Sequence, residues 1–204
     1  MNNLQGNYEA DKNLVTKVLA GDAQSFDLII QSTRILIARI VFKMVRNAED
    51  RKDIAQDIYL KAYNNLGGFA FQSKLSTWIA SIAYNTCLNY LAKKKLILPG
   101  NMELSDDSMD ETNMPRGSAS PDNRSSGTEE KMLQKELAGI LNTMQEKLPP
   151  VYQTLITLYH HEGMSYDEMG EITGLPQGTV KNYLFRARKM MKLHLLEQYK
   201  REEL

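Results

Sequence analysis

The sequence predicts an all-α protein of two small helical domains joined by a flexible linker, the C-terminal one a helix-turn-helix. Apolar residues recur at helical spacing along most of the 204 residues, and no segment shows the sustained alternation that is typical of strands. A polar segment rich in Ser, Asp, Asn, Gly and Pro interrupts this pattern near the middle. Near the end, a short helix, a turn with glycine and a second helix with one apolar face match the helix-turn-helix pattern.

The first domain, residues 1–96, is expected to contain four helices. Their apolar stripes fall, in order, within residues 14–19, 26–45, 54–66 and 79–90. The first stripe stops at Gly21 and the third at Gly67 and Gly68, because glycine favours the end of a helix over its interior. A run of three lysines follows the fourth stripe.

The linker is expected at residues 97–130. Between residues 99 and 128 there is no aromatic residue and no apolar periodicity. Such a composition cannot bury enough apolar surface to offset the entropy of ordering, so we expect a flexible tether. It is acidic, with 2 Lys/Arg against 6 Asp/Glu over residues 97–128.

The second domain, residues 131–204, begins with a helical stripe from Met132 and continues after two prolines with a second. Ser165 and Glu168 form the S-x-x-E pattern of a capping box, which opens a short helix that Gly174 ends. The last helix then turns one apolar stripe inward: Val180, Leu184, Ala187 and Met191. The other faces of this helix carry Lys181, Asn182, Phe185, Arg186, Arg188 and Lys189.

Charge is balanced overall, with 25 basic and 25 acidic residues, but it is distributed unevenly. Residues 181–201 hold 7 Lys/Arg against 1 acidic residue, and local excesses of this kind set the potential that a polyanion meets. Arg and Lys on this helix can contact phosphates and guanine edges, and Asn can bond adenine. An ordinary helical hairpin with a solvated basic face remains the alternative.

Other classes of function find little support in the chain. The longest apolar stretch, from Ile35, is broken by Arg39 and is shorter than the roughly 20 residues that span a bilayer. Cys87 is the only cysteine, and no secretion signal is visible, so we expect a cytoplasmic protein. His160 and His161 point about 100° apart on a helix and are poorly placed for one ion. No catalytic set appears, so we expect neither an enzyme nor a cofactor or metal.

Three segments resemble the small extracytoplasmic-function (ECF, group IV) branch of bacterial sigma factors. From Met164, the chain reads MSYDEMGEITGLPQGTVKNYLFRARKMMKLHL, which is similar to the last DNA-binding helices of that family. From Ala48 it reads AEDRKDIAQDIYLKAYNNLGGF, which resembles the polymerase-docking helix. From Lys74 it reads KLSTWIASIAYNTCLNYLAKKK, which resembles the promoter-melting segment. The three lie in family order within residues 48–195 of the chain.

The resemblance implies a factor that directs core RNA polymerase to promoter DNA, restrained by an anti-sigma factor that no residue here identifies. It implies docking on polymerase through Asp53, Gln56, Asp57, Tyr59 and Lys61. It implies recognition and melting of the proximal promoter element through Phe69, Phe71, Ser73, Lys74, Ser76, Thr77, Trp78 and Asn85. It implies contact with the distal element through Gln177, Thr179, Lys181, Asn182, Phe185, Arg186, Arg188 and Lys189.

Some of these residues also have a purely structural explanation. A lone tryptophan such as Trp78 is most often a core residue. A solvated helix face is the alternative for the acidic residues between 49 and 57. Two departures from the family pattern are Gly170, where alanine is usual, and Lys181, where arginine is frequent. Rival functions are a helix-turn-helix regulator that acts without polymerase docking and a helical protein–protein adaptor.

Overall fold

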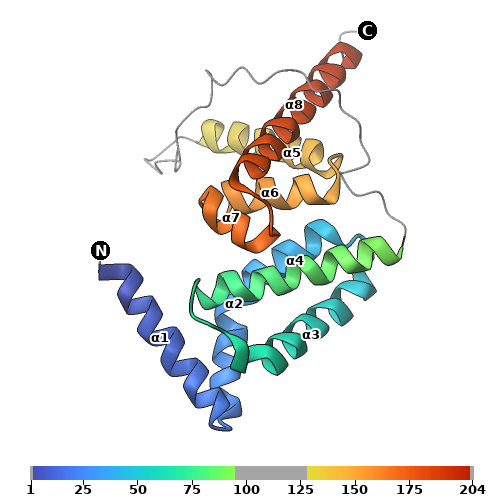
Figure 1. The fold of residues 1–204 in the computed structure, drawn as a ribbon. Coiled ribbons are helices and arrows are strands. Elements are labelled where there is room, and N and C mark those ends of the chain that lie inside the picture. The colour runs from blue at the N-terminus through green and yellow to red at the C-terminus, as the bar shows by residue number, and fades with distance from the viewer. Residues whose placement is uncertain (1, 95–127, 203–204) are drawn as a thin grey trace.

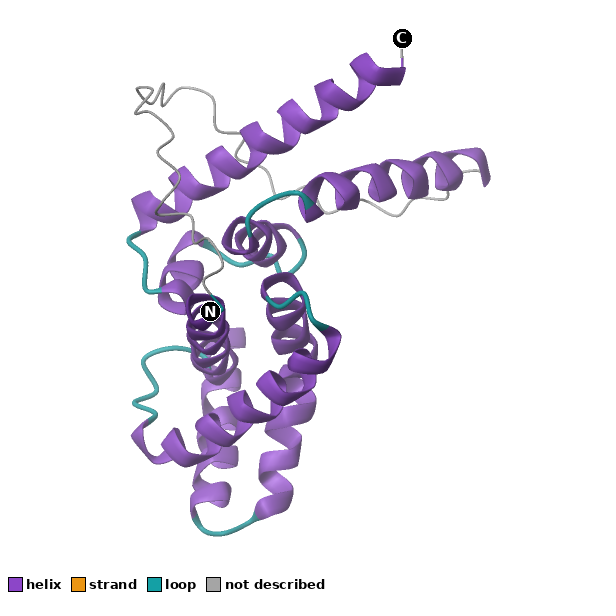
Figure 2. Cartoon of the chain, turned by 90° about the vertical axis from the view of Figure 1, so that its right-hand side faces the viewer, coloured by secondary structure: helices purple, strands orange, loops and turns teal. Residues whose placement is uncertain are grey.

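A computed structural model describes residues 2–94 and 128–202, and within those ranges every regular element is a helix (Figures 1 and 2). The all-α prediction is therefore confirmed. The first half contains α1 (Asn2–Leu19), α2 (Ala23–Met44), α3 (Ala48–Asn65), the short 3-10 helix η1 (Leu66–Gly68) and α4 (Leu75–Lys93). The second half contains α5 (Thr128–Glu146), α6 (Pro150–His160), α7 (Tyr166–Thr173) and α8 (Gln177–Glu202). Most of the expected linker lies outside the described residues, although α5 already begins at Thr128.

Side-chain caps fix where the helices of the first half begin. Asp22 accepts hydrogen bonds from the backbone N–H groups at the start of α2, and Asn47 does the same for α3. The N-terminal side chain of α4, Lys74, makes no such bond. Instead, the backbone N–H of Leu75 donates to Oδ2 of Asp11 on α1, at 3.0 Å. The first helix therefore caps the fourth.

The helix-turn-helix of the second half has the predicted local chemistry. Ser165 and Glu168 form a complete capping box at the start of α7. Gly174 ends α7 at φ +70°, a left-handed conformation that favours glycine. The residues of the predicted stripe on α8 are fully buried at Val180, Leu184 and Ala187.

Gly170 lies inside α7, where glycine is ordinarily unfavourable by about 1 kcal/mol. A Cβ atom added there would lie 3.1 Å from the carbonyl oxygen of Leu175, which is tighter than ordinary contact. A side chain at this position would therefore press on the turn after α7, which passes close to the helix.

The two halves pack directly on one another, α4 against α7 and α2 against α6 (Figure 1). The reason lies in α4, whose buried side chains, among them Ile79, Tyr84 and Cys87, spread over more than half of its circumference. A helix with so wide an apolar face requires more than one neighbour. In this fold α2 and α3 cover part of α4, and α7 covers another part. Burial, together with the nearby Tyr183 of α8, raises the pKa of Tyr84 to about 12.

Candidate interaction surfaces

The outer face of α3 holds three of the five residues expected to dock on polymerase. Asp53, Gln56 and Asp57 are exposed and lie three or four residues apart, so they share one face of the helix. Tyr59 turns instead toward α2, where its hydroxyl lies 3.1 Å from Oγ1 of Thr33. Lys61 turns toward α4, and its Nζ lies 2.7 Å from Asp57 and 3.3 Å from Oγ1 of Thr86.

Two apolar side chains complete this outer face and were not predicted. Leu60 is 60% exposed and Tyr63 is 47% exposed, and both continue the row of Gln56 and Asp57 at helical spacing. The ring of Tyr63 packs edge-on against Phe26 of α2 at 5.0 Å. These residues belong to no buried stripe, but their spacing from Asp57 is visible in the sequence.

Asp50 belongs to the same acidic segment but has a structural role. Its carboxylate accepts hydrogen bonds from Nζ of Lys94 and from the hydroxyl of Tyr90, both at 2.6 Å. The bond from Lys94, followed by that from Tyr90, holds the pKa of Asp50 below its usual value. Asp50 therefore ties the start of α3 to the end of α4.

The loop between η1 and α4 is organised by an aromatic cluster of Phe69, Phe71 and Trp78. The ring centroid of Phe69 lies 4.6 Å from that of Phe71 and 5.2 Å from that of Trp78. Tyr8 of α1 adds an edge-on contact to Phe71 at 5.9 Å. Phe71 adopts φ +57°, which is uncommon for a residue with a side chain.

The residues expected at the proximal element differ in their access to solvent. Lys74 and Asn85 are exposed, whereas Ser73, Ser76, Phe71 and Trp78 are half-buried. Phe69 and Thr77 are buried, at 6% and 2% exposure. In this arrangement a nucleotide could therefore reach Lys74 and the edge of the aromatic cluster, but not Thr77.

On α8, the predicted DNA-contact residues divide into an outer face and two flanks. Because each residue turns the helix by about 100°, Asn182 and Lys189 point away from the buried stripe, with Phe185 beside them at 54% exposure. At the start of the helix, Gln177 is exposed and donates a hydrogen bond to Asp167 of α7 at 2.9 Å.

One flank of α8 lies over two tyrosines. The guanidinium of Arg188 lies 5.1 Å from the ring centroid of Tyr159, and Nζ of Lys181 lies 5.5 Å from that of Tyr166. The two rings stack at 5.4 Å. These cation–π contacts hold both cations in place on this flank of α8 without neutralising them.

The opposite flank of α8 carries Thr179 and Arg186, both half-buried. Burial raises the pKa of Tyr152 on α6, and a hydrogen bond from Arg186 opposes that effect. The guanidinium of Arg186 is therefore engaged with α6, a contact that helical spacing alone does not predict.

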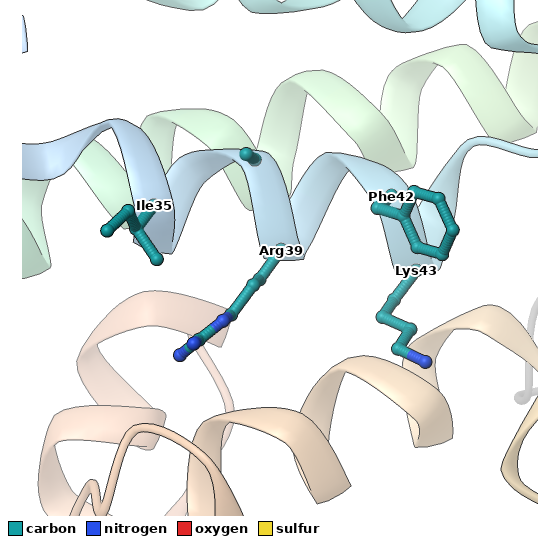
Figure 3. A pocket seen from close by; sticks show the side chains of 5 residues that line it. Ile35, Arg39, Phe42 and Lys43 are labelled. Atoms are coloured by element: carbon teal, nitrogen blue, oxygen red, sulfur yellow. The ribbon is translucent and has the colours of Figure 1, made fainter. Parts of the chain in front are cut away.

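A shallow hollow of about 340 Å³ lies along α2 and is lined by Ile35, Ala38, Arg39, Phe42 and Lys43 (Figure 3). Leu28, Ile35 and Phe42 are seven residues apart and all more than half exposed, so they form a row on the outer side of α2. Arg51 of α3 stacks on the ring of Phe42, 4.1 Å from its centroid. We call Leu28, Ile35 and Phe42 the apolar row.

Within residues 2–94 and 128–202, no group of three or more His, Cys, Asp or Glu side chains is placed to hold a metal ion. No helix there is long and apolar enough to cross a membrane.

The fold and its surfaces define a helical protein whose second half ends in a helix-turn-helix with a basic outer side. Comparison with known families identifies both halves. Residues 29–97 match the family model of Sigma-70 region 2, and residues 138–191 match that of Sigma-70, region 4.

Among characterised relatives, the chain is 32% identical over 183 residues to the RNA polymerase sigma-H factor of Pseudomonas aeruginosa, covering 89% of this chain and 91% of that one. It is 34% identical over 179 residues to the ECF RNA polymerase sigma-E factor of Escherichia coli K12, covering 88% and 91%. The chain belongs to the ECF branch of the sigma-70 family of RNA polymerase sigma factors.

Solved structures agree on the fold. CnrH, solved in complex with the cytosolic domain of CnrY, gives a TM-score of 0.58 at 18% identity and covers 91% of this chain and 97% of its own. The sigma factor RpoE of Bartonella quintana, solved with the anti-sigma factor NepR, gives 0.55 at 19% identity and covers 85% and 98%.

Proposed function

We propose that this protein directs core RNA polymerase to promoters through three separate surfaces, one on each of α3, α4 and α8. The observation that carries the assignment is the match of both halves to sigma-70 regions 2 and 4, in that order along one chain. A regulator that does not dock on polymerase, or an adaptor that does not bind DNA, would not explain why residues 29–97 match Sigma-70 region 2.

The docking surface is the outer face of α3, defined as Asp53, Gln56, Asp57, Leu60 and Tyr63. Its centre combines two exposed carboxylates with two exposed apolar side chains. Interfaces commonly use such a mixture, because the apolar groups contribute burial and the charged groups contribute orientation. Tyr59 and Lys61 support this face from beneath through Thr33 and Thr86.

The DNA-contacting surfaces are Lys74, Asn85 and the edge of the aromatic cluster for the proximal element, and the outer face of α8 for the distal element. Aromatic rings can stack on unpaired bases, while exposed lysines contact phosphates. On α8, Asn182 and Phe185 lie in the first turns, which in recognition helices reach base edges, and Lys181, Arg188 and Lys189 flank them.

The test is transcription in vitro from a promoter that responds to the wild-type chain, with purified core enzyme. Asp57→Arg is expected to abolish most of the activity and to weaken competition for core enzyme. Asp27→Arg is the matched control, because Asp27 is an exposed aspartate on α2 outside the α3 face. Equal competition for core by both variants would contradict the docking assignment.

We further propose a cytoplasmic location and a restraining anti-sigma partner. Both solved structures named above were determined with a second protein bound, which supports such a partner for this chain. The apolar row on α2 supports it too, since a row of large exposed apolar side chains marks a surface for another protein.

A further inference from the structure

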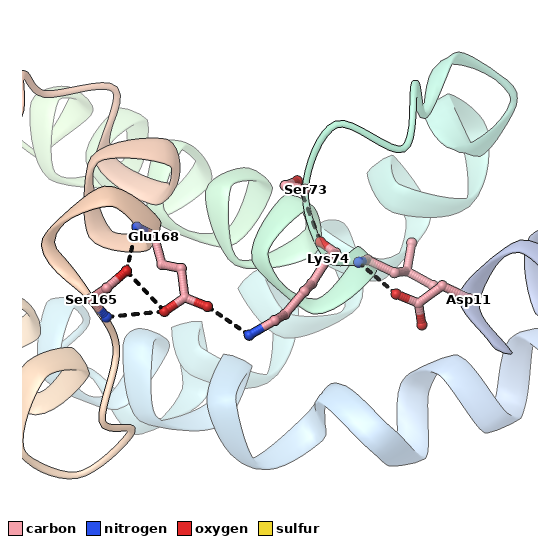
Figure 4. A network of polar contacts seen from close by, with 6 residues as sticks. Asp11, Ser73, Lys74, Ser165 and Glu168 are labelled. Atoms are coloured by element: carbon pink, nitrogen blue, oxygen red, sulfur yellow. Dashed lines mark hydrogen bonds and ion pairs between the residues drawn. The ribbon is translucent and has the colours of Figure 1, made fainter. Parts of the chain in front are cut away.

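Two ion pairs join the halves of the molecule where α4 and α2 meet the helix-turn-helix. Nζ of Lys74, at the start of α4, lies 2.7 Å from Oε1 of Glu168 on α7 (Figure 4). Arg39 of α2 pairs with Glu162, between α6 and α7. Each pair has one partner in the first half and one in the second, so both exist only while the halves are packed together.

Glu168 serves two purposes at once. Its Oε2 accepts hydrogen bonds from the backbone N–H of Ser165 at 3.0 Å and from the hydroxyl of Ser165 at 3.2 Å, which completes the capping box of α7. Its Oε1 faces Lys74 of the other half. Burial raises the pKa of Glu168, but the bonds from Lys74 and Ser165 outweigh that effect and hold the pKa below its usual value. The carboxylate is therefore charged at neutral pH.

The partner of Glu168 is a residue assigned above to DNA. Lys74 is the exposed cation beside the aromatic cluster, and a phosphate oxygen would bind its ammonium with the same chemistry as a carboxylate. Glu168 and a phosphate of the DNA strand therefore compete for one ammonium group. The packing of α7 on α4 also extends beyond this one ion pair.

We propose that the contact between α4 and α7 is an autoinhibitory latch, in which the carboxylate of Glu168 occupies Lys74 in place of a DNA phosphate and Glu162 reinforces it through Arg39. The latch rests on the proposed function, because the contact is inhibitory only if Lys74 binds DNA. Opening the latch frees Lys74 and loosens the packing of the halves, which the shared apolar core still favours.

The variants follow from the two roles of Glu168. Glu168→Gln removes the charge that holds Lys74 but keeps a side chain that can complete a capping box. Glu162→Gln weakens the second ion pair without touching the cap. Glu171→Gln is the control, because Glu171 is an exposed acid on the same helix and its replacement changes the net charge equally. Lys74→Gln opens the latch and removes the DNA contact together.

The separation of the halves is measured by energy transfer between dyes on Lys52→Cys in α3 and Lys147→Cys before α6, both at exposed positions. Native Cys87 is buried and does not take up dye in the folded chain. Binding is measured in the full-length chain with a single-stranded DNA oligonucleotide of mixed sequence. Circular dichroism melts check that α7 remains folded.

We expect Glu168→Gln and Glu162→Gln to lower energy transfer and to bind the oligonucleotide about two- to fivefold more tightly than Glu171→Gln, the range that one partly exposed ion pair supports. Lys74→Gln is expected to lower energy transfer without any gain in binding. Unchanged energy transfer in both glutamate variants, or gains no larger than that of Glu171→Gln, would overturn the latch. Failure of every form to bind DNA or to transcribe with core enzyme would overturn the proposed function instead.

Discussion

At the scale of single residues, the outer side of α8 separates side chains that are free to reach DNA from those already engaged. Lys189 is exposed and half-buried Asn182 shares its outer face, whereas Arg186 is hydrogen-bonded to Tyr152 and Arg188 lies over Tyr159. Phosphate contacts position a protein on DNA and base contacts specify the sequence. We expect the cations already engaged with the protein to make phosphate contacts. Discrimination among sequences therefore falls to the residues of the outer face.

Asn182→Ala is expected to lower transcription from a promoter with an intact distal element by roughly 1–3 kcal/mol in apparent binding free energy, if its amide bonds a base. On a promoter with a scrambled distal element, it should have little effect. Lys189→Ala should instead weaken binding to both promoters alike and reduce the salt dependence by about one unit of slope. Equal losses on both promoters for Asn182→Ala would show that this residue does not read sequence.

Cys87 should be chemically silent in the folded chain. Burial, opposed only in part by nearby Lys61, raises the pKa of its thiol to about 12, and the thiolate is the reactive form. Alkylation by iodoacetamide at neutral pH should therefore follow the rate of unfolding, and chain denatured in urea should react at once. Fast alkylation of the native chain would contradict the burial of Cys87.

At the scale of elements, helices are joined by a few well-placed polar groups. Asp11 caps α4 from α1, Asp50 ties α3 to the end of α4, and Glu168 completes the cap of α7. Asp11 and Asp50 connect helices that are distant in sequence, and Glu168 fixes where a helix begins.

The tie made by Asp50 should depend on pH. Because its folded pKa is lowered, it stabilises the fold fully above the usual pKa of an aspartate, near 4, and the contribution disappears as the pH falls through the lower folded value. Asp50→Asn should therefore lower the Tm at pH 7, and the difference from the wild-type chain should shrink below about pH 4. A difference that stays constant down to pH 2 would show that charge plays no part.

Gly170 and Gly139 make a matched pair for testing close packing in helices. Alanine normally stabilises a helix interior by about 1 kcal/mol relative to glycine, and Gly139→Ala on α5 should show such a gain because nothing lies within 4 Å of the added Cβ. Gly170→Ala should lower the Tm instead, since its Cβ would press on the carbonyl of Leu175. A gain in both variants would mean that the turn after α7 yields easily.

The sequence predicts features that arise within one helix, but not those that depend on how two helices pack. The burial of Val180, Leu184 and Ala187 follows from spacing along one helix, and the capping box of Ser165 follows from four consecutive residues. The engagement of Arg186 with Tyr152 and of Tyr59 with Thr33 depends on how two helices approach each other, which spacing does not specify. The ion pair between Lys74 and Glu168 joins residues 94 positions apart.

At the scale of the whole molecule, the two halves form one apolar core rather than two. The sequence predicts two modules on a tether, and their direct packing follows from α4, which has apolar side chains toward both halves. A helix of this kind would leave apolar surface in water if its own half stood alone.

Separated fragments should therefore associate. Residues 1–96, expressed alone, are expected to bind a hydrophobic dye more strongly than the full chain, and addition of residues 129–204 should reduce the signal as the fragments pair. Raising the salt concentration should weaken pairing only modestly, because the exposed ion pairs are screened and the apolar contact is not. Fragments that neither bind dye nor pair would show that each half is complete by itself.

The shared carboxylate of Glu168 also bears on how the protein can change over generations. The codons of glutamate and glutamine differ by one base, so a single point mutation produces the variant that keeps the cap and releases Lys74. A genetic selection for activity without an inducing signal should recover that allele repeatedly. Alleles that replace Glu168 with a residue unable to cap should be rare among the survivors, because they release Lys74 but also destabilise the start of α7.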